Sequence, residues 1–201
     1  NTIWVLPVTE VPGNIDNQIN IGYYITNFLK VELSYGTDQD YKDFVNATHE
    51  IGLKVIQDIT PNHTGREHPF AQEALLYGDY SQYWNYYQTQ FIAHNTNGLG
   101  QCVTPEGIYY YCGFSDVLLN YNWSDLDARN YMIDVYDYWV REFGIDGYRF
   151  DVYWGPHRKY GESNMGIPVR NSLKHIKPDI LLLGEDDGTG VGTEVLYADQ
   201  N

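Results

Sequence analysis

The stretch Ile145-Asp146-Gly147-Tyr148-Arg149-Phe150-Asp151-Val152 decides the fold class that this sequence predicts. It is an extended, largely apolar run, which is typical of a strand in the core of a protein. The preceding residues, from about Asp125 to Phe143, place apolar side chains at helical spacing and predict a long amphipathic helix. A helix that leads directly into a strand is the repeating unit of a parallel α/β fold.

The same alternation continues on both sides of this unit. Strands are predicted at Ile3–Leu6, Leu53–Ile59 and Asp179–Leu183, and helices at Asp38–Ile51 and Ile167–Ile176. Because strands and helices alternate with short connections, the sequence predicts an α/β fold with a parallel sheet.

Residues 64–121 interrupt this alternation. They are rich in Tyr, Asn and Gly and are too many for a plain loop, so we expect an inserted, irregular subdomain. This segment holds both cysteines, Cys102 and Cys112. Either they form a disulfide that closes a small loop, which would imply an oxidising compartment, or they are two buried thiols.

The composition excludes two classes of protein. The chain has 201 residues, with 27 acidic against 12 basic side chains and a net charge of −15. A nucleic-acid binder needs a basic surface, and no apolar run approaches the roughly 20 residues that cross a bilayer. We therefore expect neither nucleic acid nor a membrane as a partner.

Polar side chains follow three of the predicted strands, where functional groups of parallel α/β folds collect. Arg149 and Asp151 share one face of their strand, and an inward-facing Arg needs a partner such as Asp151. The adjacent cation is expected to keep Asp151 ionised, as a nucleophile requires. Glu185 ends the next strand, so the two carboxyl groups could lie roughly 5 Å apart, the separation found in retaining glycosidases. The alternative is that Arg149 and Asp151 form only a structural ion pair.

The histidines indicate ligand contact more than metal binding. His63 and His68 lie four residues apart in a loop that follows a proline, which is poor geometry for a zinc pair. We expect His63 to donate a hydrogen bond to a bound ligand.

Three stretches resemble conserved motifs of the alpha-amylase family of glycoside hydrolases and occur in the family's order: Asp58-Ile59-Thr60-Pro61-Asn62-His63, Gly147-Tyr148-Arg149-Phe150-Asp151 and Leu183-Gly184-Glu185. Gly22-Tyr23 is similar to the position at which a Tyr of the family stacks on the sugar at the cleavage point. Residues 36–56 also resemble the family's approach to its third barrel strand. The resemblance covers nearly the whole chain and is weakest in the inserted subdomain.

The resemblance implies roles for particular residues. Asp151 would be the nucleophile, Glu185 the general acid and then base, and Arg149 the partner of the nucleophile. His63 would contact the sugar, and Tyr23 would stack on it.

The resemblance also implies a structural calcium ion between the barrel and the inserted subdomain. Asn62 matches one calcium ligand of the family. The family's calcium-binding Asp falls near Asn120 or Asp125, and the sequence does not decide between them.

The fold implied is a partial (β/α)8 TIM barrel holding about the second to fifth strands, with the inserted subdomain after the third strand. Residues 1–63 would form the first part of the barrel, 64–121 the subdomain, and 122–201 the continuation of the barrel. The family's fourth motif, which carries a third catalytic Asp, is absent, so the remainder of the barrel is expected elsewhere. The family's Lys-His pair after the nucleophile is also absent, and Val152-Tyr153-Trp154-Gly155 stands there.

The function implied is a retaining hydrolase of α-glucans that forms a covalent glycosyl-enzyme on Asp151. Two alternatives stay open: a transglycosylase or isomerase of the same family, and a non-catalytic barrel that binds carbohydrate or holds a partner. A strongly acidic chain fits an enzyme that acts on a neutral polymer and is secreted or extracellular, the periplasm included.

Overall fold

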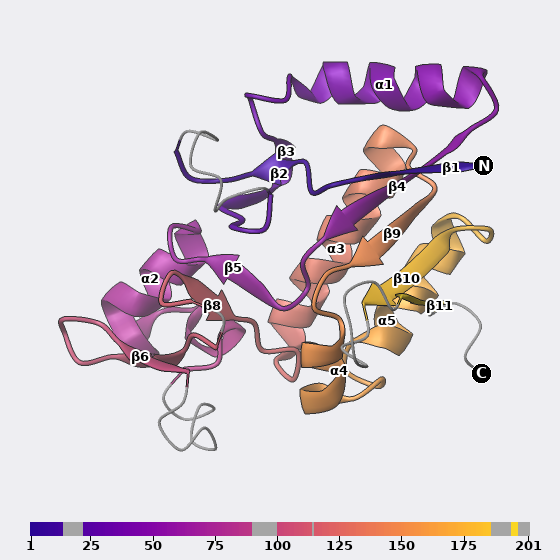
Figure 1. Cartoon of the computed structure of the whole chain (residues 1–201). Helices are drawn as coiled ribbons and strands as arrows, with labels where there is room; N and C mark the ends of the chain where they lie inside the picture. The colour runs from indigo at the N-terminus through magenta and orange to yellow at the C-terminus, as the bar shows by residue number, and fades with distance from the viewer. Residues whose placement is uncertain (14–21, 90–99, 114, 186–193, 197–201) are drawn as a thin grey trace.

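The computed structural model of the chain describes residues 1–13, 22–89, 100–113 and 115–185, together with the backbone of 194–196. Figure 1 shows the helices and strands in this part of the chain.

The main sheet has the strand order β1-β4-β9-β10-β11. The first four strands run parallel, and β11 pairs antiparallel with β10. The bounds are β1 (Thr2–Val5), β4 (Lys54–Ile59), β9 (Gly147–Phe150), β10 (Leu181–Glu185) and β11 (Glu194–Leu196). The parallel α/β prediction is therefore confirmed, whereas the antiparallel β11 was not predicted.

Helices connect these strands, and their ends follow from local chemistry. The helices are α1 (Asp38–Glu50), α3 (Leu126–Phe143), α4 (Trp154–Tyr160) and α5 (Gly166–Ile176). Thr37 and Asp40 form a capping box at α1, and the Asp125 side chain caps the first turn of α3. Helix α3 ends at Gly144, whose φ of 72° is a left-handed conformation that glycine adopts without strain. The short helix α4 was not predicted.

The described part of the inserted segment is built from short elements. They are β5 (His63–Gly65), α2 (Pro69–Tyr77), the 3-10 turns η1 (Gly78–Tyr80) and η2 (Trp84–Tyr86), β6 (Gln101–Val103), β7 (Tyr109–Tyr111) and β8 (Leu118–Asn120). β5 pairs antiparallel with β8, and β6 with β7. A second small antiparallel pair, β2 (Thr9–Glu10) and β3 (Asn27–Val31), lies between β1 and α1 in the chain.

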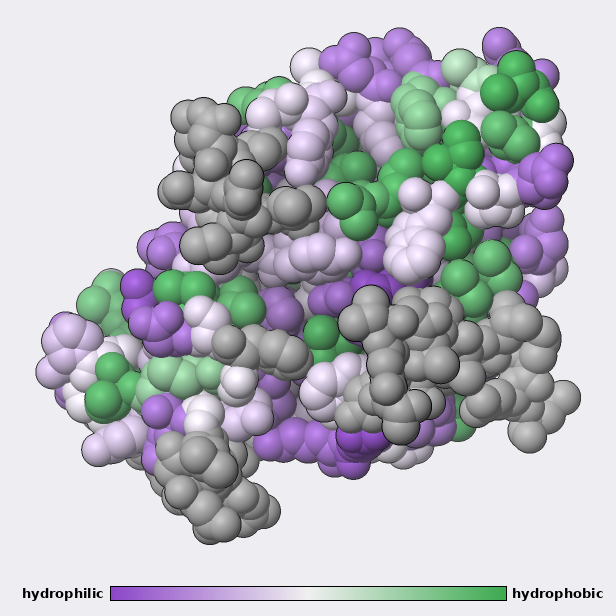
Figure 2. All heavy atoms as spheres, in the orientation of Figure 1, coloured by the Kyte–Doolittle hydropathy of each residue, from purple (hydrophilic) through white to green (hydrophobic). Residues whose placement is uncertain are grey.

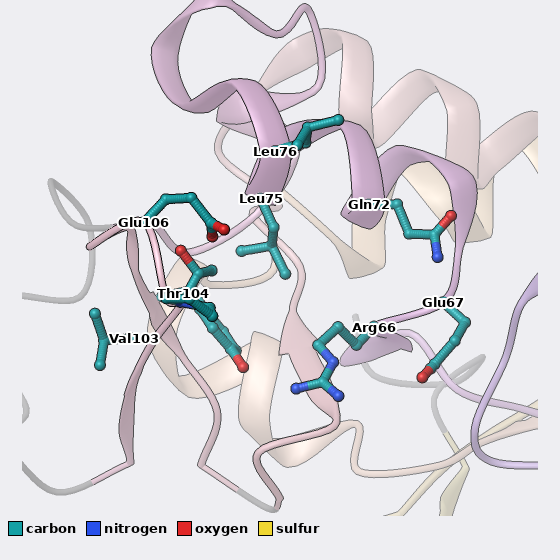
Figure 3. A pocket seen from close by; sticks show the side chains of 10 residues that line it. Arg66, Glu67, Gln72, Leu75, Leu76, Val103, Thr104 and Glu106 are labelled. Carbon is teal, nitrogen blue, oxygen red and sulfur yellow. The ribbon is translucent and has the colours of Figure 1, made fainter.

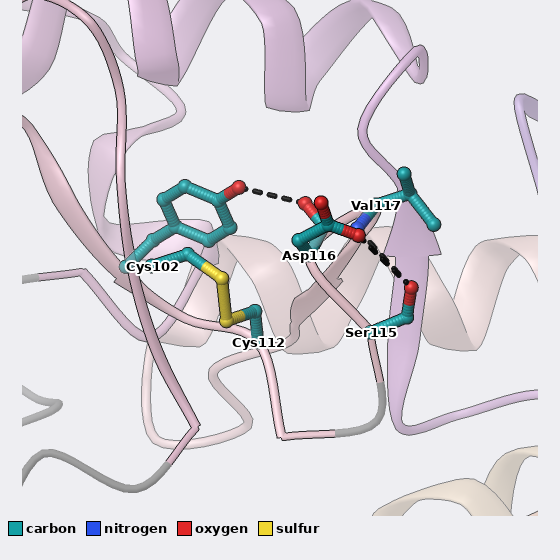
Figure 4. The surroundings of a disulfide bond; sticks show 6 residues. Cys102, Cys112, Ser115, Asp116 and Val117 are labelled. Carbon is teal, nitrogen blue, oxygen red and sulfur yellow. Dashed lines mark hydrogen bonds between the residues drawn. A yellow bond between two sulfur atoms is a disulfide. The ribbon is translucent and has the colours of Figure 1, made fainter.

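Cys102 and Cys112 are bonded to each other, with their Cα atoms 5.9 Å apart (Figure 4). Of the two possibilities that the sequence left open, the structure has the disulfide. It joins the β6 strand to the residue that follows β7, so it closes the small loop of this hairpin.

The core is aromatic, and several of its rings donate hydrogen bonds to backbone oxygens. Trp123 and Trp139 are fully buried, and their indole N–H groups donate to Pro61 O and Phe28 O, both at 2.8 Å. Tyr148 on β9 likewise donates to Tyr136 O on α3 at 2.7 Å. These bonds remove most of the cost of burying large amphipathic rings, so the helices pack tightly on the sheet.

The edge strand β1 presents apolar surface to solvent. Trp4 is 46% exposed and Leu6, just after the strand, 55%. In Figure 2 apolar surface runs along this edge of the sheet. A membrane-crossing helix would have to be both long and apolar, and no helix in the described residues meets that requirement.

Candidate active site

The site forms where β4, β9 and β10 end side by side. In the parallel register, Asp58 on β4 and Leu183 on β10 are both Cα partners of Arg149 on β9. Parallel neighbours in register point to the same face of a sheet. Arg149 is therefore flanked by residues of both adjacent strands, two positions before the strand end that carries Asp151.

Arg149 contacts three carboxylates. Its Nη1 donates to Asp151 Oδ1 at 2.7 Å and to the two Asp58 oxygens at 3.2 and 3.1 Å. Its Nη2 lies 3.0 Å from Glu185 Oε1. The predicted pairing of Arg149 with Asp151 is confirmed, and the same guanidinium also brings Glu185 beside Asp151.

The four side chains of this cluster differ in exposure. The Arg149 and Asp58 side chains are 8% and 0% exposed, whereas those of Asp151 and Glu185 are 15% and 25% exposed. Asp151 and Glu185 are therefore the two carboxylates that a ligand above the strand ends could reach. Asp58 and Arg149 form the buried support beneath them.

Burial dominates the protonation of Asp151. It raises the pKa of Asp151 to about 6, although the charge and hydrogen bond of Arg149 act to lower it. The expectation that the adjacent cation keeps Asp151 ionised left out this burial, because the sequence does not show how deeply the carboxyl group is buried. At pH 7 a group with this pKa is still about 90% ionised, so the carboxylate remains available as a nucleophile.

Asp58 and Arg149 show the same competition. Burial raises the pKa of Asp58 to about 7, against the lowering effect of Arg149. For Arg149, burial acts against the charged form, but Asp58, Asp151 and Glu185 outweigh it and raise its pKa. The Arg149 guanidinium therefore stays charged while it contacts these three acidic side chains.

Sequence reasoning missed Asp58 and Trp4. Besides Arg149, Asp58 accepts hydrogen bonds from Trp4 Nε1 at 3.2 Å and from the Tyr23 hydroxyl at 3.1 Å. The Trp4 ring lies 5.4 Å from the Arg149 guanidinium. A charged residue inside the apolar run of β4 was the available signal, because a buried Asp needs a cationic partner on a neighbouring strand.

His63 and Tyr23 lie beside this cluster. His63 is buried, and its Nε2 contacts the backbone oxygen of Tyr23 at 3.1 Å while its Nδ1 contacts Asn62 Nδ2 at 3.2 Å. Burial lowers the pKa of His63 to about 4, so the ring is neutral at pH 7. Nothing in these contacts tests whether either residue touches a sugar, and both roles stay predictions.

Gly22 explains how Tyr23 reaches the site. Its φ is 68°, and a Cβ at this position would lie 2.3 Å from Pro7 O. Only glycine permits both the left-handed backbone and this close approach. The turn brings the Tyr23 hydroxyl to Asp58.

The sequence profile described as "Alpha amylase, catalytic domain" matches residues 1–164. The chain belongs to the alpha-amylase family. The matched range includes Asp58, Arg149 and Asp151, whereas Glu185 lies beyond it.

Relatives in the family support the assignment. The chain is 30% identical over 169 residues to "Alpha-amylase 3" of Dictyoglomus thermophilum, covering 82% of this chain and 32% of that protein. It is 27% identical over 183 residues to "Cyclomaltodextrinase" of Geobacillus thermopakistaniensis, covering 91% and 28%. The solved structure of Eubacterium rectale Amy13B superposes with a TM-score of 0.78 at 25% identity, covering 92% of this chain and 37% of that one.

The chain thus spans about a third of the length of these relatives. Together with the parallel strands, the comparisons confirm the predicted fold class, which is part of a TIM barrel of the alpha-amylase family.

The three residues that the family resemblance offered as calcium ligands separate into two places. Asn120 Nδ2 lies 3.4 Å from Asn62 Oδ1, and both side chains are buried. Asp125 instead accepts the Ala128 N–H at 2.9 Å as the cap of α3. Asn120 Oδ1 is buried without a hydrogen-bond partner in the described part of the chain, and amide oxygens are ligands that Ca²⁺ accepts. Within those same residues, no group of three or more His, Cys, Asp or Glu could hold a metal.

A surface cavity of about 640 Å³ lies away from the carboxylates, between α2 and the β6–β7 hairpin (Figure 3). Leu75 and Leu76 line it together with polar residues such as Arg66, Gln72 and Glu106. None of the residues predicted from the sequence as site residues lines this cavity. The cluster at the strand ends, and not this cavity, is therefore the candidate active site.

Proposed function

We propose that this chain supplies the nucleophile and the acid/base of a retaining glycoside hydrolase that cleaves α-glucosidic bonds of starch-like α-glucans. The observation that carries the proposal is the contact of one guanidinium with two partly exposed carboxylates, Asp151 at 2.7 Å and Glu185 at 3.0 Å. A pair of carboxyl groups close together on adjacent strand ends is the arrangement that double displacement requires.

In the first step, an Asp151 carboxylate oxygen attacks the anomeric carbon of the sugar. The bond between that carbon and the glycosidic oxygen breaks, and the oxygen takes a proton from the Glu185 carboxyl group. The products are a glycosyl ester on Asp151 and the released sugar alcohol.

In the second step, Glu185 accepts a proton from water as the water oxygen attacks the anomeric carbon. The ester bond to Asp151 breaks and its carboxylate is restored. Because the anomeric carbon is inverted twice, the α configuration is retained. Arg149 takes no proton in either step; it orients Asp151 and balances the charge that moves on and off that carboxylate.

The names of the relatives support an α-glucan as substrate, since they include an alpha-amylase and a cyclomaltodextrinase. A non-catalytic barrel is disfavoured, because both carboxylates and their arginine are in contact in this chain. A transglycosylase or isomerase would use the same three residues. The rest of the barrel, with a third catalytic carboxylate, would complete the site, so the segment alone is expected to lack full activity.

We also propose that Asn62 and Asn120 hold a structural calcium ion between the barrel and the inserted subdomain. The buried, unpartnered Asn120 Oδ1 supports this proposal. The ion would supply stability and no step of the reaction.

The Cys102–Cys112 disulfide supports a location outside the reducing cytosol, so we propose a secreted, extracellular or periplasmic protein.

The test is covalent trapping in the protein that contains this chain. A 5-fluoro-α-glucosyl fluoride should label the enzyme, and peptide mass spectrometry should place the sugar on Asp151. The Asp151→Asn variant should lose labelling and at least about 10³-fold of its kcat/KM on maltoheptaose. Asp116→Asn, an exposed residue of the inserted subdomain, serves as the matched control.

Full activity in Asp151→Asn, or a label on another residue, would overturn the mechanism. Release of free sugar without longer products separates hydrolysis from transglycosylation.

A further inference from the structure

The residue after the nucleophile has a strained backbone. Val152 has a φ of 49°, and in the described residues no other side-chain-bearing residue has a positive φ. A β-branched residue adopts this conformation only when its surroundings hold it there. Strain of this kind next to a nucleophile indicates a functional reason for keeping it.

The backbone N–H of the strained Val152 donates a hydrogen bond to the proposed acid/base, Glu185. The Val152 N–H donates to Glu185 Oε2 at 2.6 Å, while Glu185 Oε1 lies 3.0 Å from Arg149 Nη2. Each oxygen of the Glu185 carboxylate is therefore fixed by a different donor. One of these donors belongs to Val152, whose positive φ turns the chain that follows it toward Tyr153.

Tyr153 fastens the turn to β10. A Cβ on Gly184 would lie 2.7 Å from Tyr153 Cδ1 and 2.9 Å from its Cγ, so the ring packs directly on the glycine backbone. Gly184 immediately precedes Glu185. The ring therefore connects the turn after β9 to the backbone that carries the acid/base.

Tyr153 also fastens the turn at its other end. Its hydroxyl donates to the two oxygens of Glu162, at 3.2 and 3.3 Å, and its ring stacks on His157 of α4 with centroids 5.5 Å apart. His157 Nε2 in turn lies 2.9 Å from Glu162 Oε1. Tyr153 is 5% exposed, so nearly all of its ring is packed against other residues.

We propose that Tyr153 is a positioning residue, which holds the strained Val152 turn so that its N–H keeps the Glu185 carboxyl group in place for proton transfer. This inference rests on the proposed function and adds to it a residue that supports the acid/base and not the nucleophile. It predicts a defect confined to steps in which the leaving group needs a proton.

The test compares two substrates in the protein that contains this chain, with kcat/KM as the readout because it reports bond cleavage and not hydrolysis of the ester. Cleavage of maltoheptaose needs a proton on the leaving oxygen. In α-maltosyl fluoride the leaving group is fluoride, which departs without a proton. For Tyr153→Leu we expect a loss of about 10- to 100-fold on maltoheptaose and less than about threefold on the fluoride. Tyr153→Phe, which keeps the ring, should show a smaller loss with the same bias.

Two further variants sharpen the test. Tyr160→Leu, at the end of α4 with its hydroxyl on Tyr121 O, is the matched control and should affect both substrates equally. Adding Val152→Gly to Tyr153→Leu should recover part of the maltoheptaose activity, because glycine holds a positive φ without strain.

Equal losses of Tyr153→Leu on both substrates, or a double variant no better than Tyr153→Leu, would overturn the inference. A wild-type protein that cleaves neither substrate would instead overturn the proposed function. If Tyr153→Leu does not fold by circular dichroism, Tyr153→Phe with Glu162→Gln decides by the same substrate ratio.

Discussion

Arg149 donates to both carboxylate oxygens of Asp58, at 3.2 and 3.1 Å, although the two residues are 91 positions apart in the chain. They are Cα partners on the adjacent parallel strands β4 and β9. This pairing holds the guanidinium from below, so its remaining donors meet Asp151 and Glu185 at the strand ends. The buried Asp58 thereby determines where the arginine of the proposed nucleophile lies.

Asp58→Asn should lower activity but leave the acid limb of the pH profile in place. Asp151, with a pKa of about 6, must be ionised to attack, so kcat/KM should fall as the pH drops through about 6. The pKa of Asp58 is about 7, so Asp58 is mostly protonated near pH 6, and its replacement by a neutral Asn changes little of the charge that Asp151 meets there. Misplacement of the guanidinium should cost about 100-fold in kcat. The measurement is kcat/KM between pH 4 and 8.

Asp146→Asn is the control for the loss of kcat, because Asp146 lies at the opposite end of the same strands. It should leave kcat near that of the wild type. An Asp58→Asn acid limb displaced from that of the wild type would show that Asp58 is charged near pH 6 and acts on the ionisation of Asp151.

The first product of cleavage should have the α configuration. The prediction follows from two carboxylates that share one guanidinium, a geometry that favours attack by Asp151 itself and leaves little room for a water between them. Proton NMR of the anomeric region during the first minutes of maltoheptaose cleavage distinguishes the anomers before mutarotation. Initial release of the β anomer would rule out the double displacement.

Asp146→Asn should destabilise the protein most at neutral pH. The buried Asp146 accepts from Lys177 Nζ at 2.6 Å, Lys54 Nζ at 3.0 Å and Val55 N at 2.9 Å, and it contacts His49 Nε2 at 2.7 Å. Burial acts to raise the pKa of Asp146, but these donors, Lys177 first, outweigh it and lower that pKa. A depressed folded-state pKa contributes stability above the unfolded value of about 4, and this stability is lost as the pH falls further.

We expect the substitution to lower the free energy of unfolding by about 3 kcal/mol at pH 7 and by clearly less at pH 3. Urea titrations at both pH values measure this difference, with the exposed Asp43→Asn as control. An equal loss at the two pH values would mean that Asp146 acts through packing and not through its charge.

Asn120→Asp should tighten calcium binding at the site proposed for Asn62 and Asn120. A carboxylate in place of the unpartnered amide oxygen adds charge to the ligand set, and ligand charge raises Ca²⁺ affinity. In millimolar Ca²⁺ the variant should melt at a higher temperature than in EDTA, by a larger margin than the wild type. In EDTA it should be less stable than the wild type, because a buried carboxylate is left unpaired.

Differential scanning calorimetry with Ca²⁺, Mg²⁺ and EDTA measures these margins. If the melting temperatures of the wild type and of Asn120→Asp do not change with Ca²⁺, the proposed calcium site at Asn62 and Asn120 is wrong.

Local chemistry made the elements predictable. The helix from about Asp125 to Phe143 has its cap residue and its glycine stop in the sequence, and the observed α3 differs from it by one residue. The strand ends could likewise be placed, because apolar runs stop at polar residues. Helix α4 escaped prediction because its seven residues carry no clear apolar period, and the antiparallel β11 because three residues are too short a run to show one.

The sequence by itself determined the alternating parallel architecture, the alpha-amylase resemblance and the identity of Asp151, Glu185 and Arg149 as the cluster to examine. These follow from periodicity and from motifs, which are properties of neighbouring residues. Only the tertiary structure decided that Asp58 and Trp4 support the arginine, that burial raises the pKa of Asp151, and that Cys102 bonds Cys112. Each of these depends on strand register, solvent exclusion or close approach between distant segments, because electrostatic and packing energies are set by distances in space and not by separation along the chain.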